Sequence, residues 1–409
     1  MRILQINTVS GYSSTGRTCV ELADFLEKKG HDSYIAYGQG ATSFEKSYKI
    51  GGVLENHLHN IGSRLYGKQG YFSTKGTINL IKLINKIDPD VIHLRNLHGN
   101  YLNIEILFDY LLKVQKPVVW SLHDCWAFTG KCAHYTDATC YKWETECHTC
   151  PQVKKYPASI FLDQTKKMFR DKSKWFNSIN NLTIVPVSKW LETEVKKSFF
   201  KYKNINQIYN WINHDIFKPL KVKEKVKVKA KYGISSAKFI VLCVSAAWNS
   251  TSNKYVDVIK LSNLIDHNTI QIVLVGKIKK QELTKNIIHL PYLHGEEELS
   301  KIYSIADTYV HLSTEDTFGK VIAEAMSCGT PAIVYNSTAC PEIIGEGCGY
   351  VVEKRNVRII YEKIQIIKEN GKKKYSSNCR NYAIDNFDLD TNINKTIKCY
   401  NQSLENNVS

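Results

Sequence analysis

The sequence predicts an α/β protein built from two Rossmann-like, doubly wound domains that face one interdomain cleft. The first reason is that short apolar, β-branched runs alternate with amphipathic stretches, as in parallel sheets covered by helices. The second is that this alternation occurs twice in succession, and the third is a length of 409 residues, which exceeds one ordinary domain. Ligands of doubly wound sheets bind beyond the carboxyl ends of the strands, so we expect the site in that cleft.

The first half of the chain contains four predicted strands with amphipathic helices between them. The strands are the runs RILQINTV (2–9), PDVIHL (89–94), PVVWSLHD (117–124) and LTIVPVS (182–188). The helices are predicted within ELADFLEKKG (21–30), LNIEILFDYLLKV (102–114) and KWLETEVKKSFF (189–200). These elements define a first domain over residues 1–210.

A second set of elements follows a break in the pattern near Pro219. Strands are predicted at FIVLCVS (239–245), IQIVLVG (270–276), DTYVHLS (307–313) and AIVY (332–335). We therefore expect a linker at 211–220 and a second domain at 221–386. The segment 387–409 is expected to return to the first domain as a helix and tail.

The composition indicates a globular protein with a basic surface. Lys and Arg outnumber Asp and Glu by 55 − 39 = 16, which favours either an anionic partner or a Lys-rich solvated surface. No RNA-binding module accompanies this charge, so we expect no nucleic-acid partner. The opening residues lack the apolar core of a secretory signal, and no run reaches the about 18 apolar residues of a membrane span. We expect a cytoplasmic protein.

A glycine-containing segment, GYSSTGRT (11–18), follows the first predicted strand and leads into a helix. Gly11 and Gly16 let the backbone approach a ligand, and the N-terminus of the helix offers amides to a phosphate or a sugar hydroxyl. Arg17 stands where P-loops carry Lys, and the GxGxxG fingerprint is absent. A tight turn without a ligand is the alternative.

His123 and Asp124 end a predicted buried strand, where α/β sheets place functional residues. This position favours a ligand contact for His123 over the alternative, a buried structural histidine.

A Cys-rich insertion over 125–151 follows directly. Twelve cysteines without a secretory signal argue against a disulfide framework. Within the insertion, four cysteines have a spacing that suits zinc, the last two as a CxxC pair: Cys132, Cys140, Cys147 and Cys150. We expect a structural zinc ion there, with His134 or His148 as substitute ligands, and reduced, packed cysteines are the alternative. No open catalytic metal site accompanies them.

The segment TEDTFGKVIAEAMSCGTP (314–331) is the most informative part of the sequence. A strand ends before it, a polar turn follows, and a helix is predicted over 319–328. The amides at the start of this helix can bind an anionic diphosphate, and they belong to Phe318, Gly319 and Lys320. Asp316 in the turn can hold sugar hydroxyls, and Glu324 lies near enough in the helix to accept hydrogen bonds from a ribose diol.

This segment resembles the E-x7-E motif of the retaining family 4 glycosyltransferases, which have the GT-B fold. The register places Asp316 at the first carboxylate position, where the family has Glu, and the adjacent Glu315 can share its role. The resemblance covers nearly the whole chain. Residues 11–17 match the family's first glycine loop, and NWINHDIFKP (210–219) is similar to its interdomain segment.

VSAAWNSTSNKY (244–255) resembles the family's G-R-x4-K-G loop, in which Arg and Lys neutralise the leaving diphosphate. Lys254 matches the Lys, and Asn249 stands where Arg is usual. The run HDCWxFTGxC, with further cysteines behind it, is similar to enzymes of bacterial O-antigen and capsular polysaccharide clusters.

The resemblance implies transfer of galactose or an N-acetylhexosamine from a UDP-sugar, with retention, to a hydroxyl of a polyprenyl-diphosphate-linked saccharide. It implies no cofactor for catalysis. Lys254 and the helix amides would stabilise the leaving diphosphate, His123 would contact the donor sugar, and the glycine loop with Arg17 would line the donor site. A GT-B-type nucleotide-sugar epimerase or phosphorylase is one alternative, and a zinc-stapled RNA-binding protein is another.

A location at the cytoplasmic face of the inner membrane is suggested by the stretch 161–179. One helical face collects its apolar residues: Phe161, Leu162, Met168, Phe169, Trp175, Phe176 and Ile179. Basic residues lie opposite: Lys166, Lys167, Arg170 and Lys174. Ordinary packing of a helix against the core predicts the same pattern.

Overall fold

The computed structural model describes residues 1–278, 283 and 286–408. The chain forms two compact units. The first comprises Met1–Tyr209 together with Asn392–Ser409, and the second comprises Asn210–Thr391.

The first unit is built on a seven-stranded parallel sheet with the strand order β3-β2-β1-β4-β5-β6-β7. Its strands are β1 (Arg2–Val9), β2 (Asp32–Gln39), β3 (Ser47–Lys49), β4 (Val91–Leu94), β5 (Val118–Leu122), β6 (Leu182–Pro186) and β7 (Asn204–Ile205). The central strands β4, β5 and β6 are buried along their whole length, as the continuous β-branched runs in the sequence require. In register, Ile3 of β1 lies opposite Ser33 of β2 and Val91 of β4.

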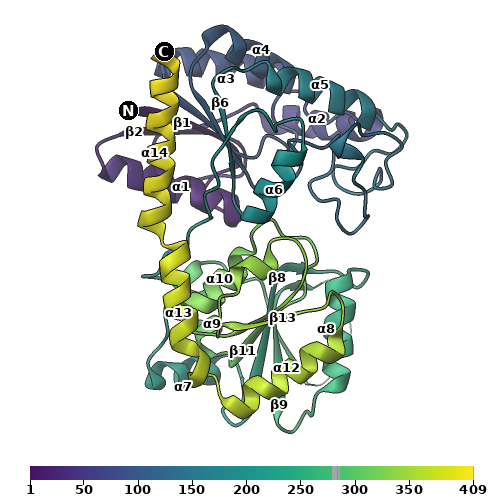
Figure 1. The fold of residues 1–409 in the computed structure, drawn as a ribbon, viewed down its shortest axis with the longest axis vertical. Helices are drawn as coiled ribbons and strands as arrows, with labels where there is room; N and C mark the ends of the chain where they lie inside the picture. The colour runs from purple at the N-terminus through teal and green to yellow at the C-terminus, as the bar shows by residue number, and fades with distance from the viewer. Residues whose placement is uncertain (279–282, 284–285, 409) are drawn as a thin grey trace. The chain divides into compact units, whose positions relative to one another are not determined.

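Helices connect and cover these strands (Figure 1). They are α1 (Ser13–Lys28), α2 (Val53–Tyr66), α3 (Thr74–Ile87), α4 (Ile104–Val114), α5 (Thr165–Asn177), α6 (Lys189–Lys197) and a 3-10 turn at Lys142–Glu144. The interval 31–90, for which no strand was predicted, contains β2, β3, α2 and α3.

The helix α14 (Leu389–Val408, yellow in Figure 1) contributes to the core of the first unit. Tyr400 is fully buried, and its hydroxyl lies 2.7 Å from Nδ1 of His93 in β4. Asn181 donates from Nδ2 to the carbonyl oxygen of Ser403 at 2.9 Å. Through these contacts α14 packs against the sheet, and its buried residues become part of the core of the first unit.

Most of the apolar residues of 161–179 lie in or just after α5 and face the core, whereas Phe161 and Leu162 precede α5 and are exposed. Met168, Phe169, Trp175, Phe176 and Ile179 are buried. The ring of Phe176, for example, lies 4.5 Å from that of Phe108 in α4, centroid to centroid. The membrane interpretation of this helix is therefore wrong, because its apolar stripe packs against the domain core.

Among the helices of the described residues, none is long and apolar enough to cross a membrane.

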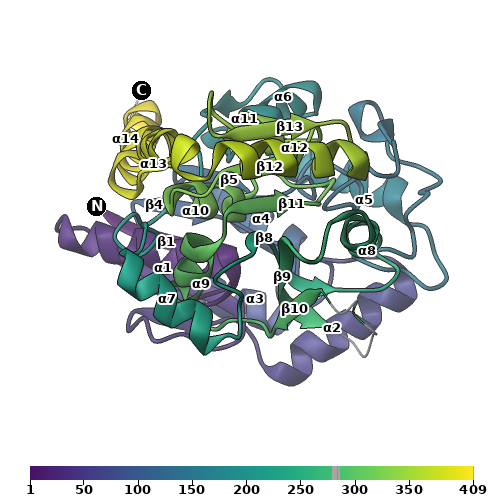
Figure 2. The ribbon, with the colours of Figure 1, turned by 90° about the horizontal axis from the view of Figure 1, so that it is seen from below.

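The second unit contains a six-stranded parallel sheet with the order β10-β9-β8-β11-β12-β13. Its strands are β8 (Phe239–Trp248), β9 (Ile270–Ile278), β10 (Ile287–Leu290), β11 (Thr308–His311), β12 (Ala332–Tyr335) and β13 (Gly349–Val352). Its helices are α7 (Val222–Lys231), α8 (Asn253–Leu264), α9 (Glu296–Ile305), α10 (Lys320–Ser327), α11 (Cys340–Ile343), α12 (Val357–Asn370) and α13 (Lys373–Phe387). Figure 2 shows α12 running along the sheet, where it packs against β11, β12 and β13.

Candidate functional site

The turn between β11 and α10 places a helix N-terminus beside an acidic residue in the second unit. Gly319 caps α10 with φ of 79°, a left-handed conformation that favours glycine, and a Cβ there would meet Cδ1 of Ile322 at 2.7 Å. The ring of Phe318 is buried, with its centroid 5.4 Å from that of Phe387. The ring therefore anchors the turn that leads into α10.

Asp316 is held in place at the end of β11 by a chain of hydrogen bonds. Its Oδ2 lies 2.5 Å from Nε2 of His311, and Nδ1 of the same imidazole lies 2.9 Å from the hydroxyl of Tyr309. The backbone amide of Asp316 donates to Oγ1 of Thr338 at 3.0 Å. A carboxylate fixed in this way is suited to orient hydroxyl groups of a ligand.

His311, Asp316 and Cys340 also present ligand atoms within 4.8 Å of one another. Burial raises the pKa of the Cys340 thiol well above its ordinary value, and the nearby Asp316 raises it further. The hydrogen bond between His311 and Asp316 joins two of these three residues.

Lys254, in the first turn of α8, is the cation that the structure brings near Asp316. Its ammonium donates to Oγ of Ser245 at the end of β8 and lies 5.5 Å from the ring centroid of Trp248. Burial lowers the pKa of Lys254, and the charge of Asp316 acts in the opposite direction. Lys254 and Asp316, predicted from separate motifs, thus belong to one electrostatic environment.

Asn249 lies in the loop between β8 and α8, and it is exposed. Its carbonyl oxygen accepts from the amide of Ser252 at 2.8 Å, and its Oδ1 accepts from the amide of Thr251 at 3.4 Å. Asn249 therefore shapes the loop that presents Lys254 and adds no cationic charge to it.

Two predicted donor-binding side chains are more enclosed than the sequence indicates. Glu324 is 1% exposed, and its Oε2 accepts from the hydroxyl of Tyr303 at 3.2 Å. The ammonium of Lys320 lies 4.0 Å from Oε1 of Glu296 and is also buried. A ribose contact by Glu324 would require the residues around it to move. Glu315 is half-buried beside the turn.

The glycine segment of the first unit differs from the predicted loop. The helix α1 begins at Ser13, so Gly16 and Arg17 lie inside its first turns rather than before it. A Cβ on Gly16 would lie 3.1 Å from Cγ2 of Val9, so this glycine permits close packing of α1 on β1. Gly11, with φ of 76°, donates from its amide to the carbonyl of Gly16 at 3.0 Å. The N-terminus of α1 is the ligand-accessible part of this segment.

A cavity of about 600 Å³ lies at the carboxyl ends of β1, β2 and β4 in the first unit. Most of the residues that line it are polar types, and five of them have carboxamide side chains: Gln39, Asn56, Asn60, Asn96 and Asn100. Ser13 and Thr15 add the start of α1, and Val53 adds the start of α2. Neutral amides and hydroxyls of this kind pair with the hydroxyl groups of a carbohydrate.

His98 lines this cavity and is a candidate residue that sequence reasoning missed. Its Nε2 lies 2.6 Å from Oδ2 of Asp124, and its Nδ1 lies 2.9 Å from the hydroxyl of Tyr156, another lining residue. Burial alone would raise the pKa of Asp124, but the charge and hydrogen bond of His98 and the amide of Trp126 lower it to about 2. The sequence feature that could have identified His98 is its position shortly after Leu94, the last residue of β4.

His123 follows β5 and is half-buried, but it is not among the residues that line the cavity. Its neighbour Asp124 is hydrogen-bonded to His98, and His98 lines the cavity.

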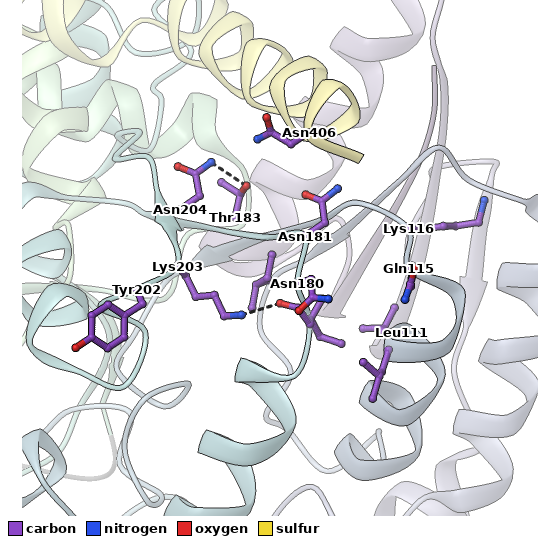
Figure 3. Close-up of a pocket in the computed structure, with 13 residues that line it drawn as sticks. Leu111, Gln115, Lys116, Asn180, Asn181, Thr183, Tyr202, Lys203, Asn204 and Asn406 are labelled. Carbon is purple, nitrogen blue, oxygen red and sulfur yellow. Dashed lines mark hydrogen bonds between the residues drawn. The ribbon is translucent and has the colours of Figure 1, made fainter. Parts of the chain in front are cut away.

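A second cavity, of about 380 Å³, lies at the opposite edge of the same sheet, by the amino ends of β5, β6 and β7 (Figure 3). Asn204 donates there from Nδ2 to Oγ1 of Thr183 at 3.2 Å. Lys203 donates to the carbonyl oxygens of Asn177 and Ile179. Doubly wound sheets bind ligands at the carboxyl ends of their strands, so we assign no function to this cavity.

Two parallel α/β units, with charged side chains and helix N-termini at the carboxyl ends of their strands, define a protein of the GT-B class. Residues 15–216 match the family described as Glycosyltransferase Family 4, and residues 225–386 match the family described as Glycosyl transferases group 1. The chain is a GT4-type glycosyltransferase with the GT-B fold. The predicted fold class and the predicted enzyme class are confirmed.

Relatives and solved structures agree with this assignment. The chain is 23% identical over 381 residues to the putative colanic acid biosynthesis glycosyl transferase WcaC of Escherichia coli K12, covering 87% of this chain and 88% of that protein. A glycosyltransferase of Rickettsia africae has the same fold, with a TM-score of 0.71, 17% identity and 99% coverage of both chains. So does HepE of Anabaena in complex with UDP, with a TM-score of 0.68, 14% identity and coverage of 98% of this chain and 100% of that chain.

Proposed function

We propose that this glycosyltransferase transfers a hexosyl unit from a UDP-sugar to a hydroxyl of a lipid-linked saccharide, with retention of anomeric configuration, in the synthesis of a surface polysaccharide. The observation that carries the proposal is the set formed by Lys254, Asp316 and the N-terminus of α10 in the second unit. A glycosyl transfer of this kind needs a leaving diphosphate to be stabilised, and a lysine with helix amides supplies that stabilisation.

The roles of the individual groups follow from their surroundings. Lys254 lies beside a carboxylate in a partly buried position, where its charge acts more strongly on a diphosphate than in water. Asp316, fixed by His311, orients hydroxyls of the donor sugar. Glu324 accepts the ribose hydroxyls once the side chains that cover it move.

UDP as the nucleotide is supported by the solved complexes of Anabaena HepE with UDP and with UDP-glucose, which share the fold. Galactose or an N-acetylhexosamine is the sugar that we propose. Polysaccharide synthesis is supported by the name of the Escherichia coli relative, a putative colanic acid biosynthesis enzyme.

The acceptor side of the proposal rests on the polar cavity of the first unit and on the surface next to it. The helix α2 exposes Val53 by 76%, Leu54 by 71% and Leu58 by 58%, although a helix of this length ordinarily buries such side chains. Ile160 donates its amide to the carbonyl of Arg64 near the end of α2, and the following Phe161 is 75% exposed. We call the residues 53, 54, 58 and 160–162 the α2 patch.

Val53, at the start of α2, belongs both to the α2 patch and to the lining of the cavity. A saccharide fits the amides of the cavity, and a polyprenyl chain or the membrane that holds it fits the apolar patch. This arrangement supports a lipid-linked acceptor, and it favours a membrane contact through the α2 patch rather than through α5.

The central test is a binding and transfer assay on the purified full chain. UDP-galactose, UDP-N-acetylhexosamines and UDP-glucose are compared with GDP- and ADP-sugars by thermal shift, since a ligand at about 100 times its Kd stabilises by about 2.7 kcal/mol. Stabilisation by UDP-sugars, with UDP released only when a polyprenyl-diphosphate-linked saccharide is present, supports the proposal. The anomeric configuration of the product is read by NMR.

Three results contradict it. If none of the nucleotide sugars stabilises the chain, the donor assignment is wrong. Conversion of a UDP-sugar without UDP release indicates an epimerase, and dependence on inorganic phosphate indicates a phosphorylase. Glu324→Ala should remove donor stabilisation while the circular dichroism stays unchanged, and normal turnover of that variant would refute its role in binding ribose.

A further inference from the structure

We propose that Cys132, Cys140, Cys147 and Cys150 bind one zinc ion as a tetrathiolate site, with Lys131 and Lys172 as buried counter-charges. The site lies in the first unit and is independent of the proposed donor and acceptor chemistry. Zinc would cross-link the segment 125–151 that follows β5.

The four cysteines surround one small cavity. All four are half-buried and carry free thiols, and all four line a cavity of about 20 Å³. That volume is on the order of one water-sized sphere, which is enough for a single ion and too little for an organic ligand. Cysteine residues brought from positions 132 to 150 onto one cavity supply the ligand number that structural zinc requires.

The thiols already receive hydrogen bonds from neighbouring N–H groups. The amide of Gly130 donates to Sγ of Cys147 at 3.1 Å, and Nε2 of Gln152 lies 3.7 Å from Sγ of Cys132. The side chains of Cys132 and Cys150 are hydrogen-bonded to each other. Such donors stabilise thiolates and fix the orientation of metal ligands.

Two buried lysine side chains lie beside the four cysteines. Lys172 on α5 is 2% exposed, and its ammonium donates to the carbonyl oxygens of Trp126 and Thr129 at 2.6 and 2.9 Å. Lys131 is 4% exposed, and its ammonium donates to three carbonyl oxygens, those of Gln152, Val153 and Lys155. Carbonyls solvate a cation but do not neutralise it, so two buried ammonium groups need negative charge nearby.

The cysteines are the groups that can supply this charge. Cys147 and Cys132 lie close enough to Lys172, and Cys150 and Cys132 close enough to Lys131, for thiolate charges to act on these ammonium groups. Four thiolates around Zn²⁺ carry a net charge of −2, which equals the charge of the two lysines with opposite sign.

Two carboxylates also lie near the lysines, but both have other partners. Asp124 is bonded to His98, and Asp163 accepts from the amide of Cys150 and from Thr165. Asp124 still acts on Lys172 and Asp163 on Lys131 together with the cysteines, and a zinc tetrathiolate would add to their negative charge.

Zinc binding would draw the sulfur atoms together. Among the residues that the structure describes, three ligand atoms lie within 4.8 Å of one another only at His311, Asp316 and Cys340 in the second unit. The sulfurs of the cluster are therefore more widely spaced, and rotation about χ1 in each cysteine would bring them onto the ion.

The test uses the full chain, purified under reducing conditions without added metal. Elemental analysis is expected to give one zinc per chain, released in step with modification of four thiols by a mercurial reagent. Replacement by Co²⁺ is expected to give the intense thiolate charge-transfer and tetrahedral absorption bands of a CoS₄ site. A metal-free protein that shows neither zinc nor the Co²⁺ bands would overturn the proposal, and so would disulfides among the four cysteines.

Variants separate this site from other thiols. Cys140→Ser with Cys147→Ser should lose zinc, whereas Cys348→Ser with Cys379→Ser, a hydrogen-bonded thiol pair of the second unit, should keep it. Retention of one zinc by the first double variant would refute the ligand set. If that variant fails to fold, the Co²⁺ spectrum of the unmodified chain still decides.

The role of Lys172 as a counter-charge is tested separately, by measuring zinc affinity. Lys172→Met should weaken zinc affinity at least about tenfold in a chelator competition, because the tetrathiolate then lacks its buried cation. Lys174→Met, an exposed position on the same helix, is the matched control and should leave the affinity unchanged. Equal affinities of the two variants would remove Lys172 from the proposal.

Discussion

Nε2 of His98 lies 2.6 Å from Oδ2 of Asp124, and this pair joins the end of β5 to the wall of the polar cavity in the first unit. The sequence separates the two residues by a whole helix and strand. Their hydrogen bond, with the contact from His98 to Tyr156, fixes the orientation of an imidazole toward the proposed acceptor.

Asp124→Asn should destabilise the protein at neutral pH. The pKa of Asp124 is lowered to about 2, below the ordinary value of about 3.9, so its contribution is present above pH 4 and is lost as the pH falls toward 2. We expect the free energy of unfolding in urea to fall by about 2 kcal/mol at pH 7, with the difference narrowing below pH 4. Asp109→Asn, at an exposed position of α4, should change neither value. A loss that is independent of pH would contradict the assignment.

Lys254→Gln should reduce kcat by about 10²-fold, because it removes the cation expected to face the leaving diphosphate. Lys260→Gln, on the exposed face of the same helix α8, is the control and should behave as the unmodified enzyme. Initial rates of UDP release with saturating acceptor provide the measurement. Equal rates for both variants would show that the diphosphate lies elsewhere.

Asp316→Asn should lower kcat/KM for the donor by about 10- to 100-fold, since the amide keeps the shape but loses the charge that orients sugar hydroxyls. Glu315→Gln tests the neighbouring acid, which lies one residue before the position that matches the first carboxylate of the motif. We expect a smaller effect there. A larger loss of kcat/KM in Glu315→Gln than in Asp316→Asn would assign the orientation of the sugar hydroxyls to Glu315.

Leu54→Glu with Leu58→Glu should weaken binding of the protein to anionic phospholipid vesicles at least about tenfold, because two exposed apolar side chains of α2 can no longer be buried in lipid. Val222→Glu with Val226→Glu, exposed on α7, is the matched control. Flotation of the vesicles gives the bound fraction. Turnover of a water-soluble acceptor should stay unchanged, and equal flotation of both double variants would exclude the α2 patch from membrane contact.

Much of the fold could be predicted because buried parallel strands are continuous apolar runs. The predicted strands at 2–9, 182–188 and 332–335 correspond to β1, β6 and β12. The strand β2 was missed because its run, DSYIAYGQ, mixes polar and glycine residues with apolar ones. Apolar residues at helical spacing can face either the protein core or a lipid surface. The sequence alone therefore does not show that the apolar side of α5 faces the core, nor that the leucines of α2 are exposed.

The sequence predicts those parts of the site that lie within one motif. The position of Gly319 as the cap of α10 followed from the helix pattern. The burial of Glu324 against Tyr303 depends on how α9 and α10 pack, and the pairing of His98 with Asp124 depends on adjacent strand ends, so neither has a signature within one segment.

The position of Tyr400 bears on how the chain folds during its synthesis. Residues 392–409 leave the ribosome after the whole second unit, yet they complete the interior around His93 of the first. A nascent first unit that lacks this helix exposes the apolar surface around His93 while some 180 further residues are made, a length on the order of that of the second unit. The second unit is one continuous stretch of chain and can fold once that stretch has been made. The core of the first unit is complete only after residues 392–409 have been made.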